Sequence, residues 1–213
     1  EFTYSKAGSG ILKVGTIVTN DDDAGRPGCV SIGSGAFIDP SFVAGYGRSI
    51  AIGNDAKVEG GNYGDGLAIG ASADTQTYSV AVGAQAKANA GTYATAVGYF
   101  ATANAAAATA IGGGADAEEK SVAVGRGADA GYSYGIAIGA AATLKALHGV
   151  AIGYEAEAYD SAVAVGLQAK TLGTNAIAIG GRVVAPTSGL VIGAAADNSI
   201  LSGQFNDTAA ATN

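Results

Sequence analysis

Side chains that commonly carry out chemistry are scarce in this 213-residue chain. The single histidine, His148, leaves a histidine-rich zinc site without enough ligands, and no nearby motif marks it as part of a catalytic triad. The single cysteine, Cys29, excludes an internal disulfide and any site built from several cysteines. We interpret Cys29 as a small buried hydrophobe. We therefore expect no catalytic residue, no metal site and no cofactor, and we predict that the chain is not an enzyme.

Two further patterns have the residue types of a binding site but not the spacing. Asp21, Asp22 and Asp23 stand together, whereas a calcium loop alternates its ligands and ends on a glutamate. We interpret this acidic run as a solvated turn. The segment 125–130 (GRGADA) has the glycine spacing of a dinucleotide loop, but no helix is expected after it. We assign it instead to the repeat described below.

The charge of the chain argues against nucleic acid as a partner. The formal net charge is −7, and the 11 lysines and arginines form no cluster that could follow a phosphate backbone. No apolar run approaches the length of a transmembrane helix. The sequence starts at Glu1 and shows no signal peptide, so we expect targeting and anchoring parts to lie outside this segment. Contact with a membrane would then occur only through such an anchor.

Glycine and alanine dominate the composition, with 35 and 48 residues. Side chains this small cannot fill the core of an ordinary two-layer domain. Collagen is also excluded, because the chain has only three prolines and lacks a Gly-X-Y period.

An internal repeat accounts for this composition. A unit of the form aliphatic-Ala-Ile/Val-Gly occurs twelve times, and nine of the eleven spacings between its glycines are 13 to 15 residues. The glycines are Gly33, Gly53, Gly70, Gly83, Gly98, Gly112, Gly125, Gly139, Gly153, Gly166, Gly180 and Gly193. Branched residues on either side of one alanine alternate with period two, which predicts a short strand. The Ala-x-Ala that follows the glycine predicts a second short strand, and a polar loop leads to the next unit.

Two short strands in each 13–15-residue coil predict an all-β parallel β-roll of about 12 coils. We expect the Ile/Val before each glycine to fill its core and the alanine face to pack against other copies of the chain. The expected core residues are Ile52, Ile69, Val82, Val97, Ile111, Val124, Ile138, Ile152, Val165 and Ile179. We divide the chain into a lead-in at 1–28, repeats at 29–196 and a transition segment at 197–213.

The repeats resemble the head repeat of YadA-like trimeric autotransporter adhesins. The resemblance is carried by 79–86 (SVAVGAQA), 121–128 (SVAVGRGA) and 149–156 (GVAIGYEA). It implies a left-handed roll, a homotrimer, and a bacterial fibre anchored in the outer membrane. It further implies a non-enzymatic adhesive or structural role, with contacts to extracellular matrix, host or bacterial surface molecules strengthened by avidity. The neck motif that usually ends such heads is not recognisable, and similar repeats occur in phage tail fibres. A shaft or receptor-binding segment of a tail fibre, located on a virion, is therefore the alternative.

Candidate ligand contacts lie in two insertions, 37–49 and 59–66, which lengthen the regular period. Tyrosine and arginine are common in contact sites, and the insertions contribute Phe42, Tyr46, Arg48, Tyr63 and Asp65. In three other coils, an aromatic ring stands five residues before the repeat glycine, at Tyr78, Tyr93 and Tyr134. His148 occupies this position before Gly153, so we interpret it as a structural ring.

Overall fold

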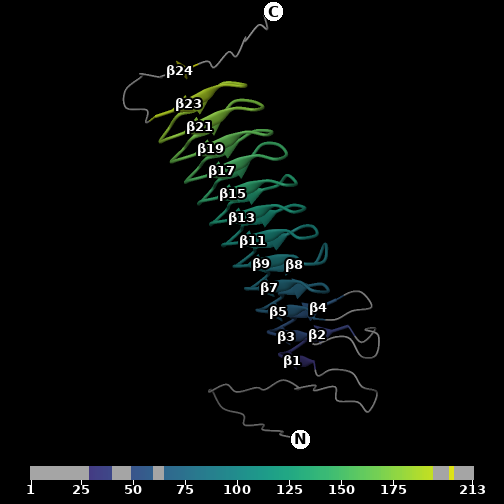
Figure 1. Cartoon of the computed structure of the whole chain (residues 1–213). Coiled ribbons are helices and arrows are strands. Elements are labelled where there is room, and N and C mark those ends of the chain that lie inside the picture. The colour runs from purple at the N-terminus through teal and green to yellow at the C-terminus, as the bar shows by residue number, and fades with distance from the viewer. Residues whose placement is uncertain (1–28, 40–48, 60–64, 194–201, 204–213) are drawn as a thin grey trace, which may run out of the picture. The chain divides into compact units, whose positions relative to one another are not determined.

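The computed structural model describes residues 29–39, 49–59, 65–193 and 202–203. Contacts between residues divide the chain into two compact units, Glu1–Lys120 and Ser121–Asn213. Both units repeat the same coil of two short parallel strands, and the described residues contain no helix (Figure 1). The all-β parallel solenoid expected from the repeat is confirmed.

In the first unit, the strands divide between two parallel sheets. The sheet of three-residue strands contains β1 (Val30–Ile32), β3 (Ile50–Ile52), β5 (Leu67–Ile69), β7 (Val80–Val82), β9 (Thr95–Val97) and β11 (Thr109–Ile111). The sheet of two-residue strands contains β2 (Phe37–Ile38), β4 (Lys57–Val58), β6 (Asp74–Thr75), β8 (Lys87–Ala88), β10 (Thr102–Ala103) and β12 (Asp116–Ala117). Each strand pairs in register with the strand one coil away, as Ala81 of β7 does with Ala96 of β9.

The second unit repeats this arrangement. Its longer strands are β13 (Val122–Val124), β15 (Ile136–Ile138), β17 (Val150–Ile152), β19 (Val163–Val165), β21 (Ile177–Ile179) and β23 (Leu190–Ile192). Its shorter strands are β14 (Asp129–Ala130), β16 (Thr143–Leu144), β18 (Glu157–Ala158), β20 (Lys170–Thr171) and β22 (Val184–Ala185). A last short strand, β24 (Ser202–Gly203), pairs antiparallel with β23 and departs from the otherwise parallel pattern.

The glycine that follows each longer strand has a conformation that other residues rarely adopt. Gly153, for example, has a φ of +137°. A Cβ atom at this position would lie 2.6 Å from the carbonyl carbon of Gly166 in the next coil and even closer to its oxygen. Glycine is required here both by the backbone angle and by the close approach of the neighbouring coil. This explains why the repeat glycine occurs in every copy.

The core of most coils is made mainly of alanine, which corrects our assignment of the two strand faces. In the coil that begins at β7, Ala81, Ala86 and Ala88 are fully buried. The ten Ile/Val residues expected in the core instead lie on the outside of the roll, where they are half-buried or exposed: Ile52, Ile69, Val82, Val97, Ile111, Val124, Ile138, Ile152, Val165 and Ile179. The predicted alternation is present, but its inner and outer faces are exchanged. Two strands joined by so short a turn leave room inside for little more than methyl groups.

Buried hydroxyl groups satisfy the backbone where some coils begin. Ser79 is fully buried, and its Oγ accepts a hydrogen bond from the Ala94 amide at 3.1 Å. The same hydroxyl donates to the Gly91 carbonyl at 3.0 Å. Ser49 acts in a similar way, because its Oγ accepts a hydrogen bond from the Gly66 amide at 3.2 Å. These serines therefore tie the loop of one coil to the start of another.

Replacing Ser79 with alanine should lower the free energy of unfolding by about 1–3 kcal/mol, because a buried amide and a half-buried carbonyl lose their partner. Denaturant unfolding followed by circular dichroism measures the change. Thr92→Ala, at an exposed position in a loop of the same unit, is the control and should stay within about 0.5 kcal/mol of the parent. Equal stabilities of the two variants would contradict this role for Ser79.

Candidate binding surfaces

One outer face of each unit is aliphatic. It consists of the first and third residues of the longer strands, and we call it the aliphatic face. In the second unit it contains Val122, Val124, Ile136, Ile138, Val150, Ile152, Val163, Val165, Ile177, Ile179, Leu190 and Ile192. Ile138 is 38% exposed, and Ile192 reaches 57%. Continuous exposed apolar surface of this kind is typical of a contact between proteins.

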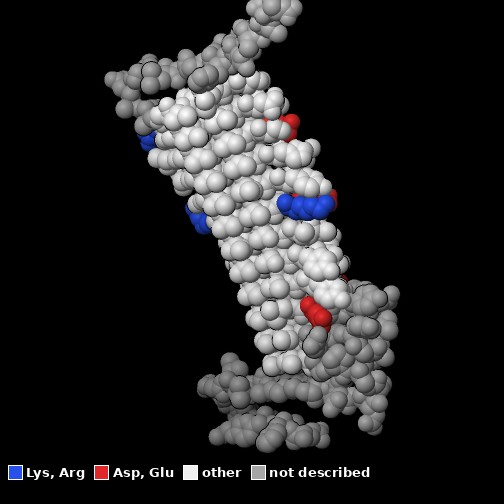
Figure 2. Space-filling model, in the orientation of Figure 1, with Lys and Arg blue, Asp and Glu red and all other residues white. Residues whose placement is uncertain are grey.

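The opposite outer face is polar. Its residues begin the shorter strands, and their register places unlike charges side by side: Lys57 pairs with Asp74, and Glu157 with Lys170. The Lys170 ammonium lies 2.6 Å from the Glu157 carboxylate, whose hydrogen bond raises the pKa of Lys170. Because both side chains are partly exposed, this ion pair adds little stability. The polar face is therefore suited to water, whereas the aliphatic face is not. Figure 2 shows few charged side chains over the coils on the side it presents.

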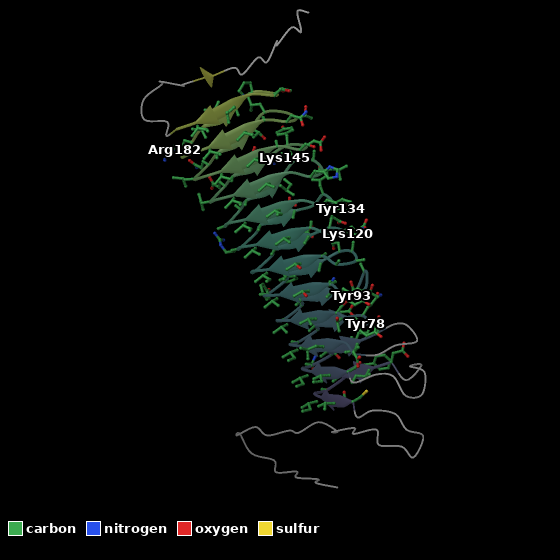
Figure 3. The ribbon with its side chains drawn as sticks, in the orientation of Figure 1. Tyr78, Tyr93, Lys120, Tyr134, Lys145 and Arg182 are labelled. Carbon is green, nitrogen blue, oxygen red and sulfur yellow. The ribbon has the colours of Figure 1, made fainter. Side chains whose placement is uncertain are left out.

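Two pairs of the loops between a shorter strand and the next longer strand carry stacked rings. We call this side of the coil the loop edge. In the first unit, Tyr78 and Tyr93 stack with ring centroids 5.5 Å apart and planes 8° apart. In the second unit, Tyr134 and His148 stack at 5.6 Å and 19°. The expectation that His148 replaces an aromatic ring in its coil is thus confirmed. Figure 3 labels the three tyrosines.

The four stacked residues share one backbone conformation. All four residues have a left-handed φ between 57° and 63°, at equivalent positions of their coils. Ala107 continues the row of the first unit with a φ of 56°, and its amide donates to the Thr92 carbonyl at 3.0 Å. A row of equivalent positions therefore runs along the loop edge of the first unit and presents its side chains to solvent.

The turns that follow the repeat glycines form the other side of the coil, the turn edge. Here Gln168 donates to the Glu155 carboxylate at 2.7 Å, and the Arg182 Nε donates to the Gln168 amide oxygen at 3.2 Å. Hydrogen bonds from Gln168 and then Tyr154 lower the pKa of Glu155. Sequence reasoning missed this polar ladder, although the 13- and 14-residue spacings of its members matched the repeat.

Most of the predicted ligand contacts lie outside the described residues: Phe42, Tyr46, Arg48 and Tyr63. The acidic run at Asp21–Asp23 also lies outside them. Asp65 is described and exposed, and its amide donates to the Ser49 hydroxyl at 3.2 Å. Cys29 is half-buried at the start of the described chain. Because only one of the five predicted contacts lies among the described residues, their joint role stays a prediction.

Among the described residues, no helix is long and apolar enough to cross a membrane. No group of three or more histidine, cysteine, aspartate or glutamate residues in this part of the chain could hold a metal ion.

Comparison with known proteins gave one match. The family model described as "YadA head domain repeat (2 copies)" matches residues 75–91, 90–115 and 160–182. These segments include β9 in the first unit and β21 in the second, so the model matches coils of both units. No curated protein and no solved structure matches the chain significantly.

Proposed function

We propose that this chain, which is built from YadA head repeats, is the head of a trimeric surface adhesin. In this role it holds surface molecules by contact alone and carries out no reaction. The observation that supports the proposal most directly is the aliphatic face, because an adhesive head of this kind needs a surface that joins its three chains. The fibre would stand outside the cell, anchored in the outer membrane.

The trimer follows from the chemistry of the two outer faces. Three chains can turn their aliphatic faces toward a shared axis and leave their polar faces in water. Burying a Val or Ile side chain contributes about 1.5–3 kcal/mol when it was fully exposed, and these side chains are only partly exposed in one chain. Many such residues in successive coils add their contributions. The packing surface we propose is therefore the Ile/Val face, in place of the alanine face that the sequence suggested.

Static light scattering should give a mass about three times the 20.5 kDa of one chain. The reason is the exposed aliphatic face, which one chain alone leaves in contact with water. The measurement is made at micromolar concentration, and a dilution series serves as its control. A mass of one chain throughout that series would remove the basis for the trimer.

Adhesion by such a head relies on many simultaneous contacts more than on the strength of any single one. Three equivalent sites in one trimer raise the effective concentration of the second and third contacts once the first has formed. Many fibres on one cell extend the same effect. We infer that matrix, host or bacterial surface molecules are held in this way, with the two insertions as the first candidates for side-chain recognition.

Shortening the insertions should weaken binding at least tenfold and leave the trimer intact. The change reduces 39–49 and 59–66 to the six-residue length of the loop 89–94, which removes Phe42, Tyr46 and Tyr63. Aromatic residues of this kind commonly dominate contact energies. Binding is measured on a sensor coated with decellularised extracellular matrix, with light scattering as the control for assembly. Unchanged binding would place the contacts elsewhere on the head.

A further inference from the structure

We propose that the Tyr78–Tyr93 stack is a platform for a neutral glycan, with a pyranose ring packed against the outer face of Tyr93. The proposal adds a ligand class to the adhesive function above and takes its biological setting from that function. The binding itself depends only on residues of the first unit, and it does not involve the two insertions.

The outer face of the Tyr93 ring is open to solvent. One face of this ring lies against Tyr78, with centroids 5.5 Å apart, yet Tyr93 is 66% exposed. The next residue of the row is Ala107, which follows Ala105 and Ala106. None of these side chains is large enough to cover a tyrosine ring. Tyr93 is therefore the last ring of the stack, and only small alanine side chains follow it in the next coil. Figure 3 shows Tyr93 beside Tyr78 at the loop edge.

The Tyr93 ring is held in place before any ligand binds. Tyr93 has a left-handed φ of 63°, and its ring is nearly parallel to that of Tyr78. The Ala94 amide, directly after it, is bonded to the buried Ser79 hydroxyl at 3.1 Å. A ring that is already fixed loses little freedom when it binds, which favours weak ligands that act through many copies.

The polarity of the surrounding loops favours a glycan over a charged ligand. The segments 76–79, 89–94 and 104–108 contain no charged residue but include the amides of Gln76, Asn89 and Asn104. The charges that flank these segments are of both signs. Asn89 donates to Asp74 at 2.7 Å and Asn104 donates to Asp116, whereas Lys87 pairs with Asp74 and the Lys120 amide donates to the Ala106 carbonyl at 3.1 Å. The three loop segments themselves supply no ionic partner for a charged ligand.

An all-equatorial pyranose suits this site. Its two faces consist of axial C–H groups, which carry a slight positive charge and are attracted to the negative face of an aromatic ring. Its rim consists of hydroxyls, which can exchange hydrogen bonds with amide and hydroxyl side chains such as that of the exposed Thr92. The ligand class is therefore a neutral, β-linked glycan with equatorial hydroxyls.

The second stack offers a different environment. His148 lies with its Nδ1 3.6 Å from the Asp160 carboxylate, and Lys145 lies in the same loop. The charges of Asp160 and Lys145 do not match a neutral ligand as well as the uncharged loops around Tyr93 do. The proposal is accordingly confined to the Tyr78–Tyr93 stack.

Cellohexaose is the probe, titrated into the full 213-residue chain with ¹³C-labelled tyrosine rings. We expect a saturable shift of the Tyr93 ring signals. Tyr93→Ala should weaken binding at least about tenfold, whereas Tyr93→Phe, which keeps the ring, should change it less than about threefold. The matched control is Tyr99→Ala. Tyr99 is 62% exposed in the same unit but lies at the turn edge, and its removal should leave binding unchanged.

Several results would overturn the proposal. A heparin hexasaccharide and a proline-rich decapeptide are titrated in parallel, and binding of either one without binding of cellohexaose rejects a neutral glycan. Equal loss in Tyr93→Ala and Tyr99→Ala would reject the platform. The matrix-binding assay keeps the two proposals distinct: matrix binding without any Tyr93 shift rejects only the glycan site, and a Tyr93 shift without matrix binding rejects only the adhesive function.

Discussion

Replacing Gly153 with alanine should destabilise the second unit by about 3 kcal/mol or more. The new Cβ atom would need a φ of +137° and would overlap the backbone of Gly166 in the next coil. The neighbour cannot yield easily, because its own position is fixed by the Gly166 amide, which donates to the Ile152 carbonyl at 2.8 Å. Thermal and denaturant unfolding followed by circular dichroism measure the loss.

Gly181 supplies the matched control in the same unit. It lies one residue after a repeat glycine, its φ is not left-handed, and a Cβ atom there would meet nothing within 4 Å. Gly181→Ala should therefore be neutral or slightly stabilising, since alanine reduces the freedom of the unfolded chain. If Gly153→Ala were as stable as Gly181→Ala, the close approach of the two coils would be wrong.

Replacing Ile138 with aspartate should abolish the trimer and leave each chain folded. Ile138 lies on the aliphatic face, in register with Val124 on one side and Ile152 on the other. A trimer would bury three such aspartates near its axis without partners, at a cost of several kcal/mol. The expected weakening of assembly is at least about 1,000-fold. Light scattering measures assembly, and circular dichroism reports whether the strands persist.

Val184→Asp is the control for this substitution. Val184 is 40% exposed, close to the 38% of Ile138, but it belongs to a shorter strand on the polar face. It pairs with Lys170, whose charge can partner the new carboxylate. This variant should remain trimeric. Loss of the trimer in Val184→Asp alone would show that the chains meet through the other face.

The sequence was sufficient to predict the coil but not which side of its strands faces inward. Spacing located the glycines and the strands, and it placed His148 in the ring position where it stacks on Tyr134. A period-two pattern defines two faces and does not by itself say which is buried. Larger apolar residues are usually the buried ones, so we expected Ile138 inside and Ala137 outside. The narrow interior reverses this order, and only the distance between the two sheets decides it.

The candidate surfaces were harder to predict because they depend on side-chain reach. The ladder from Glu155 through Gln168 to Arg182 shares a coil position, which spacing could have found. Whether such neighbouring side chains form hydrogen bonds depends on their rotamers, and the spacing of residues in the sequence does not determine rotamers. Asp65 is exposed, and its backbone amide donates to the Ser49 hydroxyl, so the contact of its side chain with a ligand stays a prediction.

One repeat glycine occurs in each coil, so the length of a stack of coils depends on how many copies of the repeat it contains. Within each unit, repeat glycines such as Gly70 and Gly153 closely approach the glycine one coil further on, so a duplicated coil would present its neighbours with the contacts they already make. A gene that gains or loses about 14 codons in phase would change the stack by one step of about 4.8 Å and preserve its interior. Insertions of other lengths would have to enter the loops. The length of the stack and the composition of its loops can therefore change independently, by two different kinds of mutation.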